Sequence, residues 1–273
     1  MVKKTIFIVL FLVTTTLIFA YLQFDRLVNE EVKTLYSETI RRDEVITDNM
    51  LQDLPPPVQR YMRYSGVVGK PWINTVNLKQ IGQMKTGPQG KWFPIVAEEY
   101  YSTNPPSFIW RVWSPKKWLP IIHGRDSYQD GKGQLLIKLL SLFSVADSKG
   151  EELDQGAMMR YLNEMMWFPT AFLGKNISWK AIDENSAEVT FTVKDKSVNA
   201  IMYFNSEGKL INFVAKRYMS KGTGFSLETW ETPILGYSEV NGFNLPTKGS
   251  AVWKLEDGDY KYIYISVNKV EYN

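Results

Sequence analysis

Cysteine is absent from this sequence of 273 residues. Its absence excludes disulfides, lipid attachment at an N-terminal cysteine, thiolate metal sites and cysteine nucleophiles. Histidine occurs only once, so a zinc site would require several carboxylates, and no group of Asp and Glu shows metal-ligand spacing. We therefore expect no metal and no cofactor, and a fold that is stabilised by its apolar core alone.

An excess of charge of one sign is also lacking. Charged residues make up 22% of the chain, the formal net charge is +3, and Lys and Arg are interspersed with Asp and Glu. Without a basic tract, no nucleic-acid partner is expected. Aromatic residues, by contrast, reach 14% and include nine Trp. In a strand-rich domain they either pack on sheet faces or form a surface on which a ligand stacks.

The one long apolar run lies at the N-terminus. Residues 5–24 carry no charge and follow Lys3 and Lys4. A helix of this length crosses a hydrocarbon core of about 30 Å, and the positive-inside rule keeps the two lysines in the cytoplasm. We expect residues 1–24 to be an uncleaved signal anchor of a single-pass protein of the cell membrane, with the C-terminal domain outside the cytoplasm. The alternative is a signal peptide cleaved after Ala20.

Two changes of pattern divide the rest of the chain. Residues 25–52 carry apolar side chains at three- and four-residue spacing, which predicts a helical stalk that leaves the membrane. The prolines at 55–57 then break this pattern, and a short helix follows that Gly66 closes. Residues 53–273 are expected to form the folded domain.

From Trp72 onward, apolar and polar residues alternate with the period of a strand. Turn sequences at 205–208, 241–242 and 257–258 separate the strands, and short turns require antiparallel neighbours. We predict an α+β fold with about nine or ten strands. A sheet of that width curls into a half-barrel, which a few helices cover. Residues 135–145 are mostly apolar and fit either a strand or a helix.

One internal helix is clearly amphipathic, with Asp154 as its predicted N-cap and Pro169 beyond its end. Its apolar stripe is rich in Met, a flexible side chain that serves irregular cores and adaptable binding surfaces alike. If the helix lies across the curved sheet, the space between them admits an acyl chain. We predict a ligand-binding set of one strand tryptophan and the helix residues: Trp110, Met158, Leu162, Met165, Met166 and Trp167. Core filling by the same helix is the alternative.

Five further residues are secondary candidates for a site. The only histidine, His123, lies near Arg125 and Asp126, and a His oriented by a carboxylate can act as a general base. No serine nucleophile elbow accompanies it, and the alternative is a turn in which Arg125 and Asp126 form a local ion pair. Arg60 and Tyr61 follow the prolines on a basic and aromatic helix, which either contacts anionic lipid head groups or packs on the domain.

Three strings resemble a family of bacterial membrane-anchored proteins that is known only as a domain of unknown function. They are LPPPVQRYMRYSG at 54–66, GRDxYxxGxG at 124–133 and RYLNEMMWFP at 160–169. The resemblance covers nearly all of the chain after residue 50 and implies no catalytic residues. The string YxxVNGxxLP at 237–246 is similar to the lipoprotein-carrier proteins of the bacterial envelope, which implies a half-closed sheet with an apolar hollow.

These patterns favour non-catalytic binding of a lipid or a lipoprotein acyl chain by a membrane-anchored domain. Two alternatives stay open: a hydrolase or glycan-active enzyme that uses scattered carboxylates, and a docking subunit of an envelope complex. An enclosed apolar cavity favours the binding protein, and convergent carboxylates in a cleft favour the enzyme. A flat exposed aromatic patch favours docking.

Overall fold

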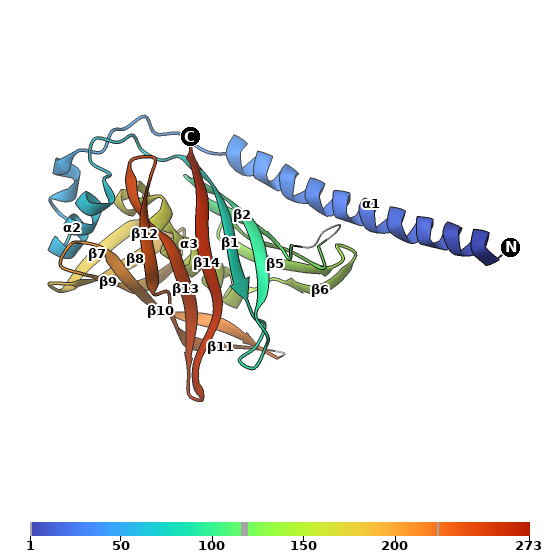
Figure 1. Ribbon diagram of the computed structural model, residues 1–273. Helices are drawn as coiled ribbons and strands as arrows, with labels where there is room; N and C mark the ends of the chain where they lie inside the picture. The colour runs from blue at the N-terminus through green and yellow to red at the C-terminus, as the bar shows by residue number, and fades with distance from the viewer. Residues whose placement is uncertain (1, 116–119, 223) are drawn as a thin grey trace.

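The computed structural model describes residues 2–115, 120–222 and 224–273. A long N-terminal helix, α1 (Val2–Ser37), projects from a wide sheet that curves around a short internal helix, α3 (Glu151–Glu164) (Figure 1). Two 3₁₀ helices, η2 (Met165–Trp167) and η3 (Pro169–Leu173), continue the chain after α3. Between α1 and the sheet lie η1 (Asp48–Leu51) and α2 (Pro56–Ser65), which ends at Gly66 in the left-handed conformation.

Within the described residues, the sheet has fourteen strands, and all the neighbours that pair are antiparallel. The predicted α+β fold with a wide antiparallel sheet is confirmed, although we expected fewer strands. The ambiguous residues 135–145 contribute to two strands joined by a turn. The strands are β1 (Thr75–Met84), β2 (Phe93–Thr103), β3 (Pro106–Trp113), β4 (Ile122–Gln129), β5 (Lys132–Leu139), β6 (Phe143–Ser148), β7 (Ile177–Asp183), β8 (Ser186–Val193), β9 (Lys196–Phe204), β10 (Leu210–Lys221), β11 (Gly224–Glu231), β12 (Ile234–Val240), β13 (Phe243–Leu255) and β14 (Gly258–Tyr272).

Strands β1 and β14 pair in the middle of the sheet. The strand order is β6-β5-β4-β3-β2-β1-β14-β13-β11-β10-β9-β8-β7, with β12 attached to β13. Most neighbours within each half are consecutive in the chain, as short connections favour. The joint between the halves runs from Val76, opposite Tyr272, to Met84, opposite Ile263. This pairing makes one continuous sheet of two locally built halves.

The sheet curves because both of its halves contact α3. The helix packs against β3, β4 and β5 of the first half and against β9 and β10 of the second. Since these strands are far apart in the strand order, the sheet has to wrap around the helix. Gly133 on β5 allows the close approach, because an added Cβ there would lie 2.5 Å from the carbonyl oxygen of Leu153.

The N-terminus of α3 differs from the prediction. The helix begins at Glu151 with Gly150 as its N-cap residue, one turn before the predicted cap. Asp154 instead accepts a hydrogen bond of 2.8 Å from the backbone N–H of Gly133, and its carboxylate lies 2.8 Å from Lys196 Nζ. This carboxylate therefore attaches the helix to the sheet.

The two halves of α1 have different surroundings. Residues 2–19 are almost entirely exposed, and the most apolar 18-residue window of the helix has a mean hydropathy of 2.4, which suits a membrane span by length and composition. From Ala20 onward, the helix packs on the sheet. The packed half contributes to a small apolar cluster with β3 and β5: Phe24, Val28, Leu35, Ile109 and Leu136. Ile109 precedes Trp110, which faces α3, so α1 lies on the opposite face of the sheet.

The helix predicted for residues 25–52 ends early. After Ser37, residues 38–47 contain no helix. The backbone N–H of Ile40 donates to the carbonyl of Asn104 (2.7 Å), and Val45 forms an isolated β-bridge with Pro71. The helical part of the predicted stalk is thus short and rests on the sheet. A domain boundary at residue 53 remains a prediction.

Residues 122–129 form strand β4, and our expectation of a turn there was wrong. Consecutive strand side chains point to opposite faces. Arg125 accordingly pairs with Glu31 of α1 (3.1 Å), whereas Asp126 pairs with Arg160 of α3 (2.7 Å). The predicted local ion pair between Arg125 and Asp126 is therefore also wrong.

His123 lies beneath α1. It is 2% exposed, its ring centroid is 4.1 Å from that of Phe24 and 5.6 Å from that of Tyr21, and its Nδ1 is 3.1 Å from Ser141 Oγ. Burial, together with the positive charge of Arg111, lowers the pKa of His123 to about 4. The imidazole is therefore neutral in the folded protein at neutral pH.

We predict that His123 makes the protein acid-sensitive. The unfolded chain protonates at the ordinary histidine pKa of 6.5, whereas the folded state resists protonation until the pH reaches about 4. The stability from this group is therefore present above pH 6.5 and lost as the pH falls towards 4. Between pH 7 and pH 5, wild type should lose on the order of 2 kcal/mol more unfolding free energy than His123→Phe. Urea titrations of both full-length proteins measure the difference, and parallel pH profiles would contradict the prediction.

Candidate functional site

A cavity of about 470 Å³ lies between α3 and the concave face of the sheet. Its volume is in the range of small-molecule sites. The walls come from both halves of the sheet, from α3 and from η2. Large apolar side chains form much of the lining: Trp110, Met166, Trp167, Phe225, Trp230, Trp253, Tyr260, Tyr262, Ile263 and Ile265.

Three of the tryptophans that line the cavity have the indole N–H bonded to a protein group. Trp110 Nε1 donates to Gln80 Oε1 (2.9 Å), Trp167 Nε1 donates to the carbonyl of Pro246 (2.8 Å), and Trp230 Nε1 donates to the hydroxyl of Tyr262 (3.1 Å). These bonds fix the indole rings and leave apolar ring surface on the cavity. The lining is therefore suited to an apolar group.

A charged cluster centred on Arg160 forms part of the same wall. Arg160 Nη2 lies 2.7 Å from Glu99 Oε1, Nη1 lies 2.7 Å from Asp126 Oδ2, and Nε lies 2.7 Å from Glu164 Oε1. The guanidinium also stacks on Trp110, 4.6 Å from the ring centroid. One arginine of α3 thereby joins carboxylates of β2, β4 and its own helix.

The carboxylates have further partners. Glu99 Oε2 accepts a hydrogen bond from Gln80 Nε2 (3.0 Å), and Glu164 Oε2 accepts one from the Tyr101 hydroxyl (3.0 Å). Burial raises the pKa of Glu99 well above its usual value; Arg160 opposes this rise, and Glu164 adds to it. The folded state therefore binds a proton at Glu99 more tightly than the unfolded chain does. The resulting stability is present at low pH and is lost as the pH rises through the raised pKa.

The predicted ligand-binding residues lie in three places. Trp110, Met166 and Trp167 line the large cavity. Met158 and Leu162 belong to the close-packed core. Met165 lines a separate cleft. The side chains of Met165 and Met166 point into different hollows. The α-helix ends at Glu164 and the 3₁₀ helix η2 begins at Met165, so the apolar stripe of α3 does not extend to these two residues.

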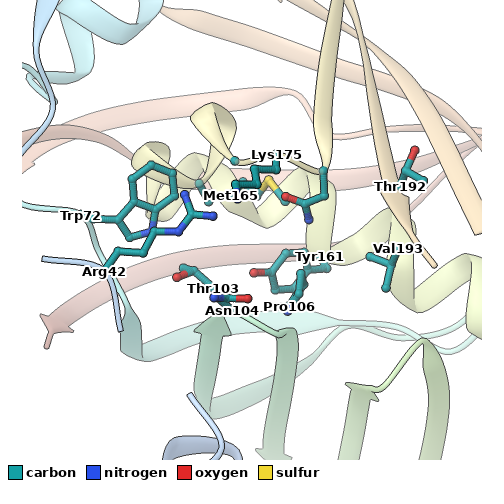
Figure 2. A pocket seen from close by; sticks show the side chains of 13 residues that line it. Arg42, Trp72, Thr103, Asn104, Pro106, Tyr161, Met165, Lys175, Thr192 and Val193 are labelled. Carbon is teal, nitrogen blue, oxygen red and sulfur yellow. The ribbon is translucent and has the colours of Figure 1, made fainter. Parts of the chain in front are cut away.

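The cleft at Met165 has a volume of about 260 Å³ (Figure 2). Figure 2 shows Arg42 and Trp72 on one side and Thr192 and Val193 on the other. The guanidinium of Arg42 lies 4.4 Å from the Trp72 ring centroid. With Thr103, Asn104 and Lys175 also in its lining, this cleft is more polar than the large cavity and suits a small polar group rather than an acyl chain.

The secondary candidates do not form one site. Asp126 lines the large cavity, whereas His123 and Arg125 face α1 on the other side of the sheet. Tyr61 is fully buried, and Arg60 donates hydrogen bonds to the carbonyl of Glu184 and to Asn185 Oδ1. Both belong to α2, which lies at the far end of the molecule from the N-terminus of α1 (Figure 1). This position gives no support to the alternative in which they contact lipid head groups.

Sequence reasoning missed Arg160, Glu99, Glu164 and Arg217 as site residues. The i,i+4 spacing of Arg160 and Glu164 is a local signal for an ion pair on a helix. Nothing local connects either residue to Glu99, more than sixty positions earlier. Among the described residues, no group of three or more His, Asp or Glu could hold a metal ion.

Comparison with known families identifies the chain. Residues 44–265 match the family model DUF6544, described as a family of unknown function. The chain belongs to this family. The resemblance to a family with a domain of unknown function is thereby confirmed. Among proteins with curated descriptions, none matches this chain.

Solved structures with a similar outline have low sequence identity. A DUF1329 family protein from Desulfovibrio piger is 9% identical at a TM-score of 0.44, over 80% of this chain and 92% of that one. A LolA superfamily protein from Nitrosomonas europaea is 10% identical at a TM-score of 0.44, and the match covers 80% of this chain and 92% of that one. A putative outer membrane lipoprotein-sorting protein domain from Vibrio parahaemolyticus is 7% identical at a TM-score of 0.41, and the match covers 83% of this chain and 92% of that one. The names of the second and third proteins agree with the predicted weaker likeness to lipoprotein-carrier proteins. Because the TM-scores are low, no ligand of these proteins is assigned to this chain.

We predict that Arg160 is essential for stability. Arg160→Gln leaves three carboxylates without their common cation at a largely buried position, so the free energy of unfolding should fall by about 3–5 kcal/mol in urea titrations. Lys194→Gln is the control, because it removes a cation from an exposed pair with Asp130 and should leave the midpoint unchanged. Equal midpoints for the two variants would show that the cluster does not hold α3 on the sheet.

Proposed function

We propose that this protein binds a lipid or another amphipathic ligand in the large cavity, while the exposed half of α1 anchors it in a membrane. The cavity itself is the observation that carries the proposal. It combines an apolar, largely aromatic lining with a volume suited to a small ligand, and it lies where a curved sheet and a single helix leave space.

The membrane part of the proposal is supported by α1. Residues 2–19 are almost entirely exposed, and water is an unfavourable surrounding for such an apolar surface. Lys3 and Lys4 precede the apolar run, which favours an N-terminus inside and a sheet domain outside the cytoplasm. Since α1 is one continuous helix that packs on the sheet from Ala20 onward, the domain would lie close to the bilayer.

One observation favours a second candidate function, that of a hydrolase. Asp126 and Glu164 converge at the cavity wall, and Glu99, whose pKa burial raises, lies buried behind them on the same arginine. A raised carboxyl pKa is typical of general acids. Each of them, however, already accepts a hydrogen bond from Arg160, and ion-pair networks produce the same pKa perturbation. A folded Asp126→Asn variant that keeps its bound lipid but loses the cellular phenotype would favour the hydrolase.

We predict that polar substitutions of two nearby methionines differ in their effects on stability and on bound lipid. Met158→Gln places an amide in the packed core and should lower the free energy of unfolding by on the order of 3 kcal/mol, with little effect on bound lipid. Met166→Gln faces the cavity, so it should destabilise less and reduce lipid recovery. Mass spectrometry of lipid extracted with each purified full-length variant, together with its melting temperature, tests this. A wild-type protein that carries no lipid would remove the support for binding.

The topology prediction has its own test. A phosphatase reporter that is active only outside the cytoplasm, fused after Asn273, should be active, because the lysines before the apolar run orient α1. Replacing both with Lys3→Gln and Lys4→Gln should reduce that activity. Reporter activity confined to the cytoplasm would refute the proposed orientation.

A further inference from the structure

The second half of the sheet contributes two cationic side chains to the lining of the large cavity, the exposed Lys248 of β13 and Arg217 of β10. Arg217 is only partly exposed. Its guanidinium stacks on two tryptophans, with its central carbon 4.7 Å from the ring centroid of Trp230 and 5.7 Å from that of Trp253. Its Nε donates to the carbonyl of Gly156 on α3 (3.0 Å). These three contacts hold the guanidinium in one orientation.

The remaining donors of Arg217 are available to the cavity. A guanidinium carries five N–H groups in one plane, of which the bond to Gly156 uses the one on Nε. Among the described residues, no carboxylate lies within ion-pair distance of Arg217, and its terminal nitrogens have no hydrogen-bond partner. Two adjacent N–H groups on such an edge match the two oxygens of a carboxylate or a phosphate.

The carboxylates closest to Arg217, across the strand pair or in the cavity, already form ion pairs with other cations. Glu228 is the cross-strand neighbour of Arg217, but its carboxylate lies 2.7 Å from Lys221 Nζ. The carboxylates at the other half of the sheet form three ion pairs with Arg160 and compensate its charge. Arg160 therefore carries no uncompensated positive charge for an anionic ligand, whereas Arg217 does.

We propose that Arg217 binds the anionic head group of an amphipathic ligand, a carboxylate or a phosphate, while the apolar chain of the ligand occupies the cavity. This inference rests on the proposed lipid-binding function and adds the charge of the ligand. The stacked guanidinium supplies a charge-assisted, two-pronged contact at one end, and the aromatic and aliphatic lining receives the chain. A neutral amphipath of the same chain length lacks the first of these contacts.

The test uses full-length protein in nanodiscs of phosphatidylcholine and three probes with one chain length. The probes are an ω-brominated fatty acid, the matching alkyl phosphate and the matching alcohol. Bromine quenches tryptophan fluorescence at short range, and residues 1–71 contain no tryptophan, so probe dissolved in the bilayer around the N-terminal half of α1 quenches little. In wild type, the acid, the phosphate or both should bind about tenfold more tightly than the alcohol.

Arg217→Gln should abolish this preference and leave binding of the alcohol unchanged. Arg217→Lys keeps the charge without the planar fork and should retain part of the preference. Lys216→Gln is the matched control, since it removes the same charge from the neighbouring, exposed residue of β10, whose side chain points to the other face. It should behave as wild type.

The outcomes separate this inference from the proposed function. If none of the probes quenches wild type, the lipid-binding function itself fails. If acid, phosphate and alcohol bind wild type equally, or if Arg217→Gln weakens all three alike, the cavity binds apolar chains and the role of Arg217 is refuted. A preference for only one of the two anions identifies the head group as a carboxylate or as a phosphate.

Discussion

The difference in size between the sheet and the helix that covers it determines much of this structure. Thirteen strands follow one another in the curved sheet, which at about 4.8 Å per strand gives a path of roughly 58 Å. The 14 residues of α3 extend only about 21 Å. A single short helix cannot fill the concave face of so wide a sheet, even with bulky aromatic side chains around it. The cavity is the part of the concave face that the helix leaves uncovered.

The cluster around Arg160 determines where on that face the helix sits. Three carboxylates and one guanidinium lose much of their hydration there, and their mutual attraction only offsets this cost if the geometry is good. A shift of α3 along the sheet would leave buried charges unpaired, whereas apolar packing alone would tolerate such a shift. Asp154 and Gly133 fix the other end of the helix in the same manner. Polar contacts thus select one position among several that the hydrophobic effect would accept.

Sequence patterns predicted the sheet, its antiparallel order and the apolar N-terminal helix, because alternation and long apolar runs are local signals. The failures also have physical causes. Residues 122–129 are rich in polar residues because both faces of β4 are covered by charged partners, Glu31 on one side and Arg160 on the other. Met165 and Met166 line different hollows, and the change from α3 to η2 after Glu164 that separates them has no clear local signal. The contact of Arg160 with Glu99 depends on tertiary structure alone.

The joint between β1 and β14 has a consequence for biogenesis. Val76 pairs with Tyr272, so the middle of the sheet closes only after β14 has been synthesised. Until then, the first half of the sheet presents an unpaired edge at β1, and its concave side lacks part of its cover. Such an intermediate is prone to strand addition from other chains. The edge of β1 therefore needs protection from other chains throughout the synthesis of the second half of the sheet.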